Sequence, residues 1–158
     1  MRIGVTGHQD IPAEALEYVI QGINGALDGA KDGLVGVSSL AVGADQIFAS
    51  LVLERGGRLE VILPSNGYEK TFSRSKDLRR FHSLLERATT IETLSFTEPS
   101  EEAYLAAGCR IVDLSEVLLA IWDGEPAKGK GGTADIVQYA KSRGARFEVV
   151  WPAGTVRR

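Results

Sequence analysis

The sequence has little of several features that mark specialised classes of protein. Among its 158 residues there are one cysteine, Cys109, and two histidines, His8 and His82. One cysteine cannot form an internal disulfide, and neither histidine has a partner at metal-ligand spacing, so we expect a reducing, cytoplasmic compartment, no metal and no cofactor. No apolar run approaches the roughly 20 residues of a membrane span, and no signal-peptide pattern opens the chain, so we expect no membrane partner.

The chain also lacks an excess of positive charge. It has 18 basic and 21 acidic residues, a formal net charge of −3. Since no global field would attract a polyanion, we expect no nucleic acid partner, and we interpret the basic stretch of Arg74, Arg79, Arg80 and His82 as a solvated helix face. With 44% hydrophobic and 25% charged residues, the chain has ordinary globular composition, and its length predicts a single domain over 1–158.

What is present is a regular alternation of two patterns. Short apolar, β-branched runs alternate with longer segments of helical spacing, which is typical of a parallel sheet covered on both faces. The runs predict strands over about 2–6, 34–38, 59–63, 90–94, 117–122 and 147–151. Helices are predicted over about 12–28, 41–55, 74–87, 100–113 and 132–143. The predicted fold class is therefore α/β, with a Rossmann-like, doubly wound, predominantly parallel sheet and helices on both faces.

The first turn after a predicted strand carries residues suited to a ligand. In open parallel sheets, ligands bind outside the carboxyl ends of the strands. Thr6, Gly7 and His8 follow the first strand. Gly7 permits close backbone approach, Thr6 offers a hydroxyl, and His8 can donate to a phosphate or accept from a ribose. The alternative is that Gly7 only turns the chain and His8 caps a helix.

The second turn has the same character. Ser38 ends a strand, and Gly43 and Asp45 open the following helix. Close packing of the helix on the sheet is sufficient to explain Gly43. Ser38 and Asp45 are candidates for ligand contact, and Asp45 could bind a ribose hydroxyl or order a neighbouring loop.

A glycine-rich segment follows the fifth predicted strand. There the strand ends at Asp123 and Gly124, a loop of glycines and lysines follows, and Gly131, Gly132 and Thr133 lead into a helix. Backbone amides and the helix N-terminus together favour an anion. The segment is neither a G-x-x-x-x-G-K-[ST] phosphate loop nor a G-x-G-x-x-G fingerprint in the first βα turn. The alternative is a flexible loop with Thr133 as N-cap.

Taken together, GVTGH, SLAVGAD, ILPS, and LLAIWDG followed by GKGGTADIVQYA resemble the SLOG superfamily. This Rossmann-like group unites DprA/Smf proteins, LONELY GUY phosphoribohydrolases and molybdenum-cofactor carrier-like proteins. The resemblance implies a homodimer or higher homo-oligomer and a pocket for a nucleotide or nucleotide derivative. The residues it assigns to that pocket are Thr6, Gly7, His8, Ser38, Gly43, Asp45, Pro64, Asp123, Gly124, Gly131, Gly132 and Thr133.

The catalytic members share a P-G-G-x-G-T-x-x-E signature, whose glutamate acts on the N-glycosidic bond. In this chain Lys128 replaces the proline, Lys130 replaces the second glycine, and Ile136 occupies the glutamate position. Asp135 comes one residue early, so its carboxylate would leave a helix about 100° from the expected direction. We therefore predict binding or sensing of a phosphorylated nucleotide or nucleotide-derived ligand. The alternatives are a nucleotide N-glycosidase using Asp135 or Asp123, and a carrier of an anionic cofactor such as molybdenum cofactor.

Overall fold

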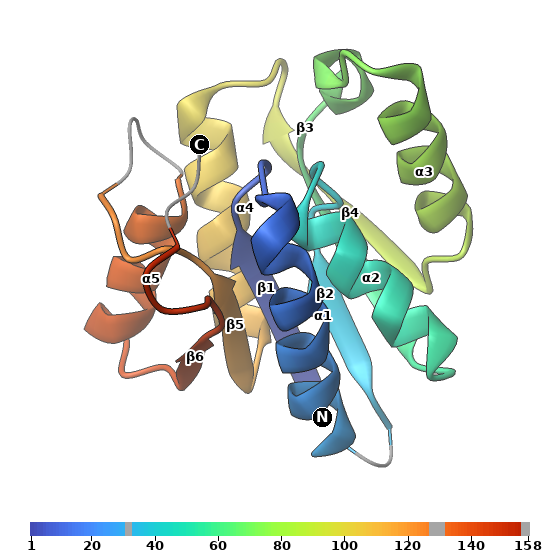
Figure 1. Ribbon diagram of the computed structural model, residues 1–158. Helices are drawn as coiled ribbons and strands as arrows, with labels where there is room; N and C mark the ends of the chain where they lie inside the picture. The colour runs from blue at the N-terminus through green and yellow to red at the C-terminus, as the bar shows by residue number, and fades with distance from the viewer. Residues whose placement is uncertain (31–32, 127–131, 156–158) are drawn as a thin grey trace.

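A six-stranded parallel sheet forms the centre of the protein (Figure 1). The computed structural model describes residues 1–30, 33–126 and 132–155. Each predicted strand is present within a few residues of its expected bounds, which confirms the α/β, Rossmann-like fold. The strands are β1 Arg2–Gly7, β2 Val35–Ser38, β3 Arg58–Ser65, β4 Thr90–Phe96, β5 Val117–Ile121 and β6 Phe147–Val149.

The order of the strands creates one reversal of direction in the sheet. The spatial order is β4-β3-β2-β1-β5-β6, so the chain moves outward from β1 to β4 and then returns to place β5 on the other side of β1. Loops that leave β1 and β5 diverge to opposite faces at such a point, which opens a crevice at the carboxyl ends of the strands. This topology predicts where a ligand would bind.

Helices cover both faces of the sheet. Helices α1, α2 and α3 lie on one face, and α4 and α5 on the other (Figure 1). Their bounds are α1 Ala13–Asp28, α2 Ala44–Glu54, α3 Ser75–Glu86, α4 Glu101–Leu114 and α5 Thr133–Ser142. Within the described residues, no helix is both long and apolar enough to cross a membrane.

The alternation of side chains in β1 explains this two-sided arrangement. Ile3 and Val5 are buried in the core under α1 and α2, whereas Gly4 faces α4. A Cβ atom at Gly4 would come within 2.6 Å of the Ile111 side chain, so the absence of a side chain there lets α4 approach the sheet closely.

Two features differ from the sequence-based expectation. Strand β3 continues through Pro64 to Ser65, and its register with β4 shifts between Leu63 and Ser65. A proline that cannot donate a ladder hydrogen bond is tolerated at such an irregularity. After β3 a short 3₁₀ helix, η1 Tyr68–Thr71, forms between the strand predicted over about 59–63 and the helix predicted over about 74–87.

Candidate functional site

A cavity of about 590 Å³ opens at the carboxyl ends of β1, β2 and β3, beside the reversal of strand order. This volume lies within the usual range for small-molecule sites. The following residues line it: Val5, Thr6, Gly7, His8, Gln9, Asp10, Ser39, Ala41, Val42, Asp45, Pro64, Tyr68, Thr71, Phe72, Tyr104, Ala107, Gly108, Ile111, Gly132, Thr133 and Ile136. The cavity therefore joins loops after four strands with one side of α4.

Seven of the residues that the sequence assigned to a pocket lie in this wall. They come from the turns after β1 and β2, from the end of β3, and from the start of α5: Thr6, Gly7, His8, Asp45, Pro64, Gly132 and Thr133. Residues as far apart in the sequence as Thr6 and Thr133 are thus brought to one space, as the carboxyl-end rule predicts. Their contact with a ligand stays a prediction.

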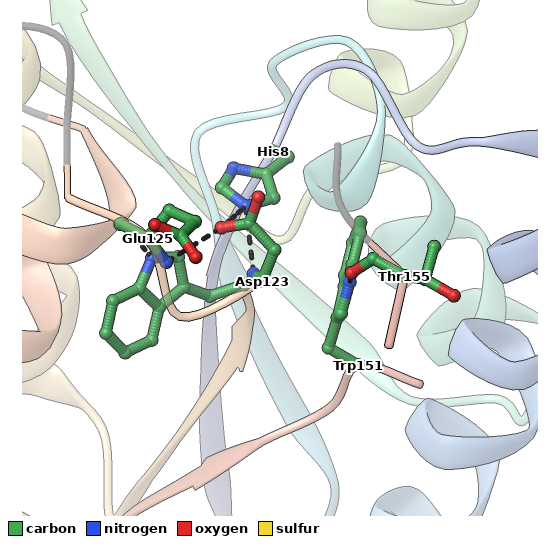
Figure 2. A network of polar contacts seen from close by, with 6 residues as sticks. His8, Asp123, Glu125, Trp151 and Thr155 are labelled. Atoms are coloured by element: carbon green, nitrogen blue, oxygen red, sulfur yellow. Dashed lines mark hydrogen bonds and ion pairs between the residues drawn. The ribbon is translucent and has the colours of Figure 1, made fainter. Parts of the chain in front are cut away.

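The turns after β1 and β5 are tied together by His8. The backbone N–H of Asp123 donates to His8 Nε2 at 3.0 Å, and Asp123 Oδ1 lies 3.1 Å from the same nitrogen. Figure 2 shows the two side chains facing each other, with Trp151 beside them; the Trp151 ring meets the His8 ring edge-on at 5.3 Å. Both partners of the pair are almost fully buried, so His8 fixes one side of the cavity in place.

Asp123 also shapes the loop that leads toward α5. Its Oδ1 accepts from the backbone N–H of Glu125 at 3.0 Å, and the indole N–H of Trp122 donates to the Glu125 carbonyl at 2.8 Å (Figure 2). Gly124 between them has φ +88°, a left-handed conformation that favours glycine. Asp123 and Gly124 thus order the turn and do not line the cavity themselves.

Gly43 allows the turns after β1 and β2 to touch. It has φ +88°, and a Cβ atom there would lie 2.6 Å from the His8 carbonyl oxygen and closer still to that of Gln9. The next residue, Ala44, donates its N–H to the His8 carbonyl at 3.1 Å. The contribution of Gly43 to the cavity is therefore this close approach.

Asp45 is the most unusual polar group in the wall. Its carboxylate accepts from the backbone N–H of Ala41 at 3.2 Å, and Ser39 supplies a second backbone hydrogen bond. Burial raises the pKa of Asp45 from 3.8 to about 7, against the smaller opposing effect of those two bonds. A strongly perturbed carboxyl in a cleft is typical of a functional site.

Ser38 supports Asp45 from behind the wall. Its hydroxyl donates to the Asp45 carbonyl at 3.3 Å and accepts from the N–H of Leu40 at 3.0 Å. Leu40 has φ +59°, which is rare for a branched residue and costs backbone strain. Ser38 thus holds the turn that presents Asp45 and is not itself in the cavity wall.

The start of α5 provides the side of the cavity most suited to an anion. Gly132 and Thr133 line it, and the first N–H groups of a helix have no partner within the helix. Gly131 and the preceding Lys128, Gly129 and Lys130 lie outside the described residues.

The position of the catalytic glutamate in the enzymes' signature is occupied by a buried apolar side chain. Ile136 lines the cavity and packs on Gly108 of α4, where an added Cβ atom would collide with it. Asp135, the neighbouring carboxylate, is not among the lining residues.

Sequence reasoning missed the aromatic part of the wall as a group. Tyr68 and Phe72 come from η1 and the residue after it, and Tyr104 comes from α4. The Tyr68 ring meets Phe72 at 5.5 Å and Tyr104 at 6.3 Å, each at a steep angle. The available signal for Tyr68 and Phe72 was the mixture of Tyr and Phe between the strand predicted over about 59–63 and the helix predicted over about 74–87.

The comparisons with known proteins agree on the fold. No protein-family model matches the chain, and no curated protein matches it in sequence. Two solved structures of DNA processing protein A are similar. The one from Helicobacter pylori has a TM-score of 0.69 and 19% identity over 94% of this chain and 64% of that chain. The one from Streptococcus pneumoniae has a TM-score of 0.66 and 17% identity over 94% and 49%.

A third solved structure, of the protein TM1055, has a TM-score of 0.58 and 16% identity, covering 92% of this chain and 71% of that one. This chain therefore spans about half to two thirds of the length of the two DprA structures.

One expectation is corrected by these neighbours. The Helicobacter pylori structure describes how that protein binds single-stranded DNA, so the exclusion of a nucleic acid partner is wrong. The physical reason is that a net charge sums over the whole chain and does not report a local basic face. The fold itself matches the Rossmann-like fold that the motifs indicated, and the chain shares it with these three solved structures.

Proposed function

We propose that the cavity binds a phosphorylated nucleotide or nucleotide-derived ligand and does not hydrolyse it. The observation that carries the proposal is the meeting of two groups in one cavity: the N-terminus of α5, suited to a phosphate, and the buried Asp45, suited to a hydroxyl donor. Both are held by backbone contacts that exist without a ligand.

The part of the proposal that excludes hydrolysis rests on Ile136. The glycosidase signature places its general acid–base group, a glutamate, at this position, where it would lie within hydrogen-bond reach of the reacting atoms. An isoleucine cannot transfer a proton, and its side chain fills the place where the signature has a glutamate. Occupancy of the cavity would then act as a signal, through the loops that His8 and Asp123 connect.

The experiment is a screen of the purified protein with nucleoside monophosphates, cyclic nucleotides and ADP-ribose derivatives. Melting temperature and free base are followed in the same samples, the latter by chromatography. We expect stabilisation by at least one phosphorylated compound, a weaker effect of the matching nucleoside, and no free base. No stabilisation at millimolar concentration would refute binding, and base release would make the protein a glycosidase.

A second candidate function is binding of single-stranded nucleic acid. Helix α3, which begins soon after the cavity-lining Phe72, exposes Lys76, Arg79 and Arg80 to solvent. Exposed cations on one helix beside a nucleotide-sized cavity could hold the phosphates of a strand. A similar solved structure is that of a protein that binds single-stranded DNA.

The two candidates are separated by fluorescence anisotropy with a labelled oligodeoxythymidylate. Strand binding predicts saturable anisotropy that weakens steeply between about 50 and 200 mM salt. It also predicts loss of binding when Lys76, Arg79 and Arg80 are changed together to Gln. No anisotropy change at low salt would exclude this second function.

A further inference from the structure

The cavity wall changes its chemistry along the sheet. Thr133 belongs to the helix after β5, Thr6 ends β1, Asp45 follows β2, and Tyr68 and Phe72 follow β3. In the sheet these strands lie in the order β5, β1, β2, β3. Neighbouring strands are about 4.8 Å apart, so the wall extends roughly 14 Å from the anion-binding end to the aromatic end.

The middle of the wall carries Asp45 and Tyr68. A carboxylate has about four acceptor positions, and the two backbone N–H groups at Asp45 use only part of that capacity. Tyr68 is 5% exposed and lines the same cavity, and its hydroxyl makes no hydrogen bond with any residue that the structure describes. Burial raises the pKa of Tyr68, and the negative charge of Asp45, which lines the same cavity, adds to that effect.

The far end of the wall is aromatic. Phe72 and Tyr104 are partly exposed, line the cavity and flank the buried Tyr68. Flat rings of this kind offer surface on which a planar base can stack or lie edge-on.

Resting on the proposed function, we propose that the cavity takes a single ribonucleotide along the sheet edge, with its phosphate at α5, its ribose hydroxyls on Asp45 and its base against Phe72 and Tyr104. Asp45 then determines specificity for the sugar. A ribose presents two neighbouring hydroxyl donors to the carboxylate, whereas a 2′-deoxyribose presents one. The deoxy ligand leaves a buried acceptor without a partner, which is costly.

The test compares adenosine and guanosine 5′-monophosphates with their 2′-deoxy forms by calorimetric titration. For the wild-type protein we expect about tenfold or more tighter binding of the ribonucleotides, as for the loss of a hydrogen bond to a charged group. Asp45→Asn should weaken ribonucleotide binding and remove most of this preference. Glu54→Gln, which alters an exposed carboxylate on the same helix, should change neither quantity.

The outcomes separate this inference from the proposed function. Equal binding of both sugars by the wild-type protein would overturn the role of Asp45 and leave nucleotide binding intact. An unchanged preference of Asp45→Asn for ribonucleotides would likewise overturn the role of Asp45 and leave nucleotide binding intact. If none of the four nucleotides bound, and the wider screen found no phosphorylated ligand, the proposed function itself would fail. Tyr104→Ala should weaken the binding of ribonucleotides and deoxyribonucleotides equally. An unchanged affinity would show that the base does not lie against the aromatic end of the wall.

Discussion

Replacement of Asp45 by asparagine should make the protein more stable at neutral and alkaline pH. Asn is close in shape to the neutral carboxyl, and its side-chain oxygen can still accept from the N–H of Ala41. Unlike the carboxylate, it carries no charge that burial penalises.

The magnitude follows from the pKa of Asp45. Burial raises this pKa from 3.8 to about 7, so between those pH values the unfolded chain loses its proton while the folded protein keeps it. The folded state binds more protons there, and stability therefore falls as pH rises, until it levels off above about pH 7. At about 1.4 kcal/mol per pH unit, ionisation of Asp45 costs the folded protein about 4 kcal/mol in total.

The assay is urea unfolding of both proteins at several pH values, followed by circular dichroism. The free energy of unfolding of Asp45→Asn minus that of the wild type should grow by up to about 4 kcal/mol from about pH 4 to about pH 8. Other titrating groups cancel in this difference. A difference that does not depend on pH would show that Asp45 ionises normally in the folded protein and would refute the reasoning.

Further substitutions test the local structure of the site. Gly43→Ala should destabilise the protein by roughly 3 kcal/mol or more, because Gly43 has a positive φ and an added Cβ atom would collide with the carbonyl groups of His8 and Gln9. Gly25→Ala should stabilise the protein by about 0.5–1 kcal/mol, because Gly25 lies in α1 with open space around it. Thermal melting of the two variants checks the sign of each change. Ser65→Ala should raise the free energy of unfolding by about 1 kcal/mol, because the buried Ser65 hydroxyl has no hydrogen-bond partner in the described structure. A lower melting temperature for this variant would indicate a partner that the described structure does not contain. Asp135→Asn should leave nucleotide affinity within about twofold, since Asp135 does not line the cavity; a tenfold loss in calorimetry would place its carboxylate in the site.

Most of the fold could be predicted from the sequence because its determinants are local. The β-branched runs that became β1 and β5 are short, apolar and bounded by turn residues, and such runs form buried parallel strands. The start of α4 agrees with the helix predicted over about 100–113, and Ser100 accepts from the N–H of Ala103 there as an N-cap does. Helix η1 was not visible, because its position depends on Tyr68 packing against Phe81, a contact made only in the folded core.

The candidate site likewise has residues that could be predicted from the sequence and residues that could not. Thr6, His8, Asp45 and Thr133 could be found because the carboxyl ends of parallel strands converge whatever the details of packing. The wall formed by Ala107, Gly108 and Ile111 could not, since these residues lie in the middle of α4 and only the placement of that helix turns them toward the cavity. Ser38 and Gly43 support neighbouring turns and are not among the residues that line the cavity, so their contact with a ligand stays a prediction.

The central claim is that the cavity binds a nucleotide and does not hydrolyse it. The most direct test is a calorimetric titration of the purified protein with the nucleotide that stabilises it most, followed by chromatography of the same sample after prolonged incubation. We expect saturable binding near one ligand per chain and no free base, because Ile136 occupies the position that the glutamate has in the catalytic signature. Absence of any binding heat at millimolar nucleotide, or the accumulation of free base, would contradict it.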